Sequence, residues 1–156
     1  MRHLAAFLAL TLLPTLPALA QTKTSQKMEK RSINPWQWQD QRNYAQAVDV
    51  KHAAGTLYCS GQTAIDADGK SSSADMRTQL VLALQNLEQV ILAAGYEPKN
   101  IVRLNVYTTS SAEFFPCFEV LQAWIVKHGM KQATTLLEVK SLFETLTVEL
   151  EATVVQ

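Results

Sequence analysis

Two carboxylates near the C-terminus, Glu149 and Glu151, stand two residues apart, and such groups can do acid/base chemistry. They lie in the segment 146–155, where apolar and polar residues alternate strictly. This period of two, with Val and Thr prominent and no Gly or Pro, predicts a half-buried β-strand. Residues two apart then lie on one face, about 7 Å from each other. Glu149 can accept a proton from an attacking water. Alternatively, both carboxylates are solvated or bridge two subunits on a sheet face.

Gly61 is the most informative glycine of the chain, because Ser60-Gly61-Gln62 interrupts a predicted strand at 56–65. A glycine inside a strand often marks a bulge, or a place where another group approaches the backbone closely. Both interpretations are open. The segment Tyr44–Val50 also has strand character, and the turn at 51–55 predicts a hairpin between these two strands.

Metal and redox chemistry have little support in the sequence. Asp66-Ala-Asp-Gly69 begins like a calcium loop, but its glycine comes at position four instead of six, and Arg77 occupies position twelve. Cys59 and Cys117 are not in CxxC spacing, so we expect buried free thiols, although an oxidising compartment would allow them to pair. We expect no metal site.

Composition and charge favour a single globular domain. The chain has 156 residues, of which 47% are hydrophobic and 18% charged. Lys and Arg number 14 and Asp and Glu also number 14, and no basic stripe or polybasic run is present. We therefore expect no nucleic-acid partner and no binding to anionic membranes.

Residues 1–20 are typical of a secretory signal peptide. A short basic start precedes a mostly apolar run at 4–13, and Ala18-Leu-Ala20 has the form of a cleavage site. The apolar run is too short for a bilayer anchor, so we expect a periplasmic or secreted protein with no membrane attachment after cleavage. Translation from Met28 would instead give a cytoplasmic protein. Residues 21–33 are predicted to be a flexible tether, and 34–156 a single domain.

The remaining pattern predicts two helices and three more strands. Residues 76–94 form an amphipathic helix behind a capping box at Ser72–Asp75, and a second helix runs from Ser110 to His128. The other predicted strands are 101–108, 133–140 and 146–155. This order fits an α+β two-layer sandwich, a mixed β-sheet with two long helices on one face. The other face of such a sheet often meets another subunit.

Five short motifs occur in the order and spacing of one protein family. They are Cys59-Ser-Gly-Gln62, Ala94-Gly-Tyr96, Asn100-Ile-Val-Arg-Leu-Asn-Val-Tyr107, Leu137-Glu-Val139 and Val148-Glu-Leu-Glu-Ala152. Through them the chain resembles the Rid family (reactive intermediate deaminase, YjgF/UK114). The resemblance implies a chorismate-mutase-like fold, a homotrimer with a small-molecule ligand at each subunit interface, and no metal or organic cofactor. It also implies hydrolysis of enamines and imines such as 2-aminoacrylate, which releases ammonia and a 2-keto acid.

The resemblance transfers four candidate site residues to this chain. Tyr44 matches the tyrosine that closes the cleft, and Ser60 and Gly61 match the backbone segment that lines it. Glu149 matches the acidic residue that helps to position water, which makes it the catalytic candidate. Imine hydrolysis requires little more than a positioned water, a carboxylate to accept its proton, and donors that orient the substrate.

Three positions depart from the pattern of the family's deaminases. Thr134 stands in place of the arginine that grips the substrate carboxylate, Leu136 in place of a cysteine, and Phe118 in place of an asparagine. By their positions, Thr134 and Phe118 join Tyr44, Ser60 and Gly61 as the predicted substrate-binding residues. A single hydroxyl has neither the charge nor the planar fork of a guanidinium. Arg103 and Lys140 are the strand-borne cations nearest in sequence that could supply the charge.

Two functions are compatible with these residues. The first, which we favour, is a Rid-like hydrolase of an enamine, an imine or a related reactive metabolite, with a substrate altered because Thr134 replaces the arginine. The second is a non-catalytic trimer of the same fold that binds a small molecule or other proteins.

Overall fold

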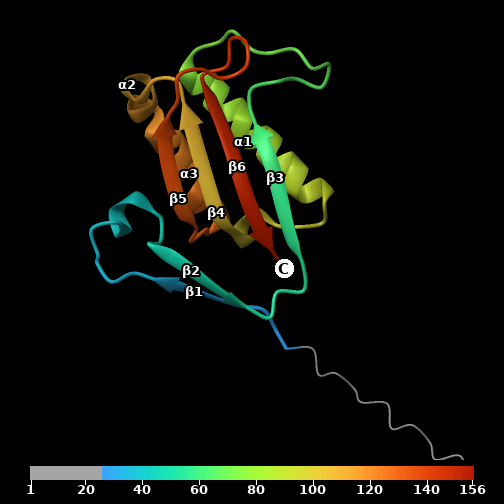
Figure 1. The fold of residues 1–156 in the computed structure, drawn as a ribbon, viewed down its shortest axis with the longest axis vertical. Coiled ribbons are helices and arrows are strands. Elements are labelled where there is room, and N and C mark those ends of the chain that lie inside the picture. Colours follow the sequence, from blue (N-terminus) through green and yellow to red (C-terminus); the bar gives the residue numbers. More distant parts are fainter. Residues whose placement is uncertain (1–25) are drawn as a thin grey trace, which may run out of the picture.

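The computed structural model describes residues 26–156 (Figure 1). The predicted signal peptide and the first part of the predicted tether lie outside the described residues, so the predicted export stays a prediction. None of the helices in residues 26–156 has both the length and the apolar character needed to cross a membrane.

Four strands form the main sheet, in the order β3 (Thr56–Gln62), β6 (Val148–Val155), β4 (Ile101–Thr108) and β5 (Ala133–Glu138). β6 is antiparallel to both β3 and β4, whereas β4 and β5 are parallel. Helices α1 (Met76–Ala93) and α3 (Phe118–His128) cover one face, and the other face is open in the described chain (Figure 1). This confirms the predicted α+β fold, a mixed sheet with two helices on one side.

The alternating pattern of β6 produces this layering. Its even-numbered residues are at most 2% exposed and pack against the apolar stripe of α1, and its odd-numbered residues up to Thr153 lie on the open face. The buried β6 residues are Val148, Leu150, Ala152 and Val154; their α1 partners in the core are Leu80, Leu84, Leu87 and Ile91. Burial of these side chains is the main stabilising term of the domain.

The helix ends follow local chemistry. The carboxylate of Asp75, rather than Ser72, caps α1 by accepting a 2.8 Å hydrogen bond from the Thr78 amide. The second predicted helix is interrupted: a single turn, α2 (Ser111–Phe114), leads into a 3-10 turn at Phe115–Cys117 before α3 begins. Pro116 has no N–H to donate to the preceding turn, which explains the tighter winding.

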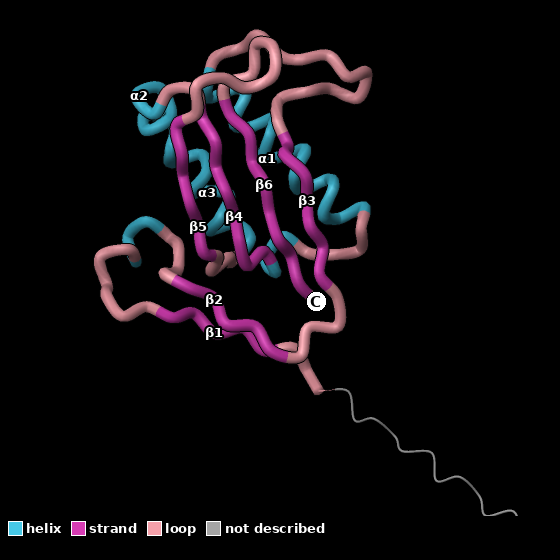
Figure 2. The backbone as a smooth tube through the Cα atoms, in the orientation of Figure 1, coloured by secondary structure: helices cyan, strands magenta, loops and turns pink. Residues whose placement is uncertain are grey.

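The predicted hairpin between 44–50 and 56–65 is wrong. β2 (Ala47–Lys51) pairs antiparallel with β1 (Glu29–Ile33), a strand within the segment assigned to the tether. Figure 2 shows this pair beyond one end of the main sheet. His52, with a φ of 56°, turns the chain after β2, so β3 continues into the main sheet instead of folding back on β2.

Candidate functional site

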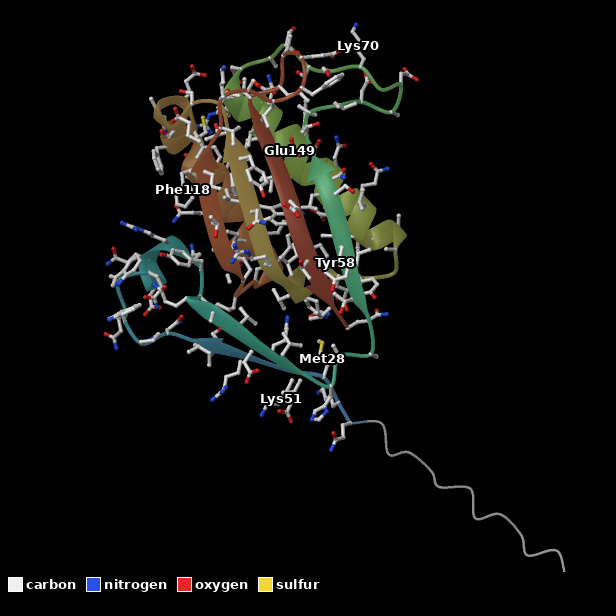
Figure 3. The ribbon with its side chains drawn as sticks, viewed as in Figure 1. Met28, Lys51, Tyr58, Lys70, Phe118 and Glu149 are labelled. Atoms are coloured by element: carbon white, nitrogen blue, oxygen red, sulfur yellow. The ribbon has the colours of Figure 1, made fainter. Side chains whose placement is uncertain are left out.

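The candidate residues form two groups on opposite faces of the main sheet. Thr134 is in register with Leu104 and, across β4, with Ala152, so it faces the helices. Glu149 is in register with Tyr107, which is next to Leu137 on β5, so it lies on the open face. Figure 3 labels Glu149 on β6 and Phe118 beside the β5 edge.

The first group surrounds a cavity of about 180 Å³ between β5 and α3. It contains three of the predicted substrate-binding residues, which are Tyr44, Phe118 and Thr134. The other residues that line it are Arg42, Val106, Phe115, Leu121 and Leu136. The cavity is therefore mostly apolar, with one hydroxyl, one phenol and one guanidinium.

Tyr44 is brought to this cavity by the segment that precedes β2. The Ala45 amide donates a 2.9 Å hydrogen bond to the Gln132 carbonyl, and Ala45 forms a parallel bridge with Ala133 next to Thr134. The fully buried Gln132 then donates from its side-chain amide to Thr134 Oγ1, at 3.1 Å, and to the Asn43 carbonyl, at 3.3 Å. These bonds hold the chain against the edge of β5.

Arg42 is the residue that sequence reasoning missed. It ends a 3-10 turn at Asp40–Arg42, and its Cζ lies 5.5 Å from the ring centroid of Trp38. Trp38 in turn packs edge-on against Tyr44, with a centroid distance of 6.2 Å. The sequence feature that could have pointed to Arg42 is its position two residues before Tyr44, a predicted site residue.

The two cations suggested by the sequence do not line this cavity. Arg103 lies on the open face and donates to Asn105 Oδ1 and Thr135 Oγ1, both at 2.8 Å. Lys140 is exposed beyond the end of β5. Neither supplies the missing charge within one chain.

The second group is built from Gly61 and Glu149. A register shift between Cys59 and Gln62 places a bulge at Gly61, opposite β6. A Cβ added at Gly61 would overlap the carboxylate of Glu149, lying 2.5 Å from its Cδ and 2.9 Å from its Cγ. The bulge interpretation of this glycine is thus confirmed, and the side chain closest to its backbone is that of Glu149. A ligand contact at Gly61 stays a prediction. Ser60 is exposed beside it.

The two glutamates of β6 have different surroundings. Glu151 accepts hydrogen bonds from the Tyr107 hydroxyl, at 2.8 Å, and from Asn105 Nδ2, at 3.3 Å. The bond to Glu151, together with burial and the charge of that carboxylate, raises the pKa of Tyr107. Glu149 is half-buried and forms no side-chain hydrogen bond or ion pair with the described residues. Of the two, Glu149 is therefore the carboxylate available to a water or ligand.

Two larger hollows, of about 410 and 560 Å³, lie between residues 61–73 and α1. Asn86 lines both, but its amide is already bonded to the carbonyls of Thr63 and Ile65. Asp66, which also lines both, accepts from the amides of Asp68 and Lys70 in its own turn. Neither hollow contains any of the predicted site residues except Gly61, which lines the larger one, so the site is assigned to the two groups above.

Residues 26–156 contain no group of three His, Cys, Asp or Glu side chains that could hold a metal ion. Cys59 and Cys117 are buried and free, as predicted. Burial raises the pKa of the Cys59 thiol, so at neutral pH it is a poor nucleophile.

Comparisons with known proteins agree with this fold. A family model described as endoribonuclease L-PSP matches residues 38–156. The 2-iminobutanoate/2-iminopropanoate deaminase of Mus musculus is 30% identical over 114 residues, covering 72% of this chain and 81% of the mouse protein. The structure of YyfB, a Rid-family protein from Yersinia pestis, matches with a TM-score of 0.72 and 28% identity, covering 81% of this chain and 98% of YyfB. The structure of E. coli TdcF with bound serine matches with a TM-score of 0.61 and 26% identity, covering 72% and 87%.

Proposed function

Because the chain belongs to the Rid (YjgF) family, which the endoribonuclease L-PSP model describes, we propose that it hydrolyses a small enamine, imine or related reactive metabolite. An enamine first takes a proton from solvent at carbon and becomes the protonated imine. Water adds to the carbon of this C=N bond while Glu149 accepts a proton from it. Glu149 returns that proton to nitrogen, and the C–N bond breaks as the hydroxyl loses its own proton to water, so that ammonia leaves and a carbonyl product remains. The observation that carries this proposal is the unpaired carboxylate of Glu149, held against the bulge at Gly61.

The cleft is formed by two copies of the chain. Glu149 and Thr134 lie on opposite faces of one sheet, so a ligand that touches both groups has to lie between subunits. Exposed Tyr58 and Leu137, at 78% and 50%, lie on the open face with Glu149 and favour an interface there. Since each copy presents two different surfaces, the interface is head-to-tail, and such an interface forms a closed ring when its rotation allows, as the predicted homotrimer requires.

The substrate is expected to differ from that of deaminases with an arginine at the position of Thr134. The mouse relative is named for 2-imino acids of three and four carbons. We compare the substrate of this chain with that class. A cavity of about 180 Å³ lined by Phe118 and Leu136 suits a molecule of that size. The family description also names an endoribonuclease. The equal numbers of acidic and basic residues and the single cation in the cavity do not favour RNA as the ligand.

The alternative is a non-catalytic trimer that binds a small molecule or another protein. It is favoured by the three substitutions that make the cavity more apolar: Thr134, Leu136 and Phe118.

Ammonia release from 2-aminoacrylate, generated in situ, tests the proposal. The wild type is expected to turn over this reference compound more slowly than its own substrate, and Glu149→Gln, which keeps the size but loses the base, is expected to lose about 10² to 10⁴ in that rate. Glu144→Gln, an exposed carboxylate in the loop before β6, is the control and is expected to retain wild-type turnover. Full activity in Glu149→Gln contradicts the mechanism. No turnover in the wild type or in Thr134→Arg, with no ligand bound to the oligomer, favours the non-catalytic alternative.

A further inference from the structure

We propose that Arg42 binds the anionic group of the ligand in the cavity at the β5 edge, so the substrate is a short-chain carboxylate although residue 134 is threonine. This inference deepens the proposed function and rests on it for the identity of the reaction. The binding step is independent of turnover and is tested separately below.

The first argument is the charge of the cavity. Of the eight described residues that line it, Arg42 alone is charged at neutral pH, and the remaining walls are largely apolar. A guanidinium at the mouth of an apolar space attracts a ligand with one anionic end and a short apolar end. The cavity volume of about 180 Å³ is the volume that about six water molecules occupy in liquid water. The part of the ligand inside the cavity is therefore limited to a few carbon atoms.

The second argument is that the donors of Arg42 are free. Within residues 26–156, Arg31 pairs with Asp49, Arg77 pairs with Glu119, and Arg103 donates to Asn105 and Thr135. The Arg42 side chain has no hydrogen bond or ion pair to a described residue, and its stacking partner is Trp38. Contact with a ring occupies the face of a guanidinium and leaves its N–H edge free for a carboxylate.

The third argument is the rigidity of the segment that carries Arg42. The side chain of Gln122 on α3 donates to the Gln41 carbonyl at 3.2 Å, and Gln132 donates to the Asn43 carbonyl at 3.3 Å. Asn43 has a left-handed backbone, with a φ of 58°, which turns the chain between Arg42 and Tyr44. Arg42 is thus flanked by residues whose backbone is fixed against α3 and β5, and less freedom is lost when it binds a ligand.

Thr134 acquires a second role in this arrangement. Its oxygen accepts the hydrogen bond from Gln132 Nε2 at 3.1 Å, and its own proton is then available to a ligand. A carboxylate held by Arg42 from one side can accept that proton from the other. Thr134 then assists the binding of the anion, and the charge comes from Arg42.

The test measures binding and turnover separately on the full oligomer. The probes are 2-oxobutanoate and its uncharged methyl ester, titrated by calorimetry or ligand-detected NMR. Arg42→Gln is expected to weaken 2-oxobutanoate binding by about 10- to 100-fold, the effect of losing a charged hydrogen-bonding partner, and to leave the ester unchanged. Arg31→Gln, in β1, is the matched control and is expected to bind like the wild type. The double variant Arg42→Gln/Thr134→Arg is expected to recover affinity.

Each result decides one question. Equal 2-oxobutanoate binding by wild type and Arg42→Gln, equal binding of acid and ester, or no binding of the acid by the wild type overturns the role of Arg42. If Arg42→Gln turns over 2-aminoacrylate with an unchanged KM, the proposed function holds and this inference fails. If the wild type binds the acid through Arg42 but releases no ammonia from 2-aminoacrylate, the inference holds and the proposed function fails. The Tm of Arg42→Gln is expected to equal that of the wild type, because Arg42 is exposed. An unchanged Tm shows that any loss of binding in this variant does not come from misfolding.

Discussion

Gly61→Ala is the substitution that most directly tests how Glu149 is held. The added Cβ would overlap Glu149 Oε1 and lie 2.5 Å from its Cδ, whereas ordinary contact begins at 3.4 Å, so Cδ has to move by about 0.9 Å and Oε1 by more. A displacement of about 1 Å in a reacting group can lower the rate by about 100-fold, which corresponds to about 2.7 kcal/mol in the activation free energy. We therefore expect kcat for ammonia release to fall by about that factor.

Stability should change little in the same variant. Gly61 is not among the residues with positive φ, so alanine can adopt its backbone conformation. The gain of about 0.4–1 kcal/mol from a less flexible unfolded chain offsets the cost of moving the carboxylate at the partly exposed surface. We expect the free energy of unfolding, measured by urea denaturation, to change by less than about 1 kcal/mol.

Gly69→Ala is the contrasting control. Gly69 has a φ of 79° with no atom within 4 Å of an added Cβ, so alanine there strains the backbone without touching Glu149. This variant should lose about 1 kcal/mol of stability and keep its kcat. In a Glu149→Ala background, Gly61→Ala should have no further effect on rate, because no carboxylate is left to displace. The reasoning is refuted if Gly61→Ala keeps both full activity and the wild-type ¹³C shift of the Glu149 carboxyl carbon.

Three further outcomes follow from the core, the open face and the thiols. Leu87→Ala should lower the free energy of unfolding by about 2–5 kcal/mol in urea denaturation, because Leu87 is fully buried between α1 and the sheet. Since the hydrogen bond to Glu151 raises the pKa of Tyr107 above its usual 10.0, its contribution to stability is present below pH 10.0 and is lost as the pH rises further. Tyr107→Phe should reduce that alkaline loss in denaturation curves, and an unchanged slope would contradict the pairing. Cys59 should react slowly with iodoacetamide at pH 8 in the native state and rapidly in denaturant, and fast native labelling would contradict its burial.

The main sheet could be predicted because its strands carry their own pattern. β6 alternates strictly, and β4 and α1 have the periods of a half-buried strand and an amphipathic helix, so each follows from local residues. β1 could not be found in this way. Its sequence, Glu-Lys-Arg-Ser-Ile, has one apolar side chain, and it is held by pairing with β2 and by the Arg31–Asp49 contact.

The candidate site was predicted in its residues but not in its arrangement. Periodicity identified Glu149 on a polar face, and the glycine in a strand identified Gly61. The position of Arg42 depends on side-chain bonds from Gln122 and Gln132, which lie far away in sequence and have no period. Likewise, the separation of Thr134 from Glu149 depends on which face of β5 Thr134 occupies. The β5 sequence, Ala-Thr-Thr-Leu-Leu-Glu, does not alternate between apolar and polar residues, so it does not indicate that face.

The placement of the two groups on opposite faces predicts complementation between subunits. If a cleft takes Glu149 from one copy and Arg42 from the next, two variants that are each impaired should complement one another. After denaturation and refolding of Glu149→Gln and Arg42→Gln in equal amounts, about a quarter of the clefts in randomly mixed rings would inherit both intact side chains. At substrate concentrations well below the KM of Arg42→Gln, higher turnover in the mixture than in either parent refolded by itself would reveal that the working unit is a pair of neighbours.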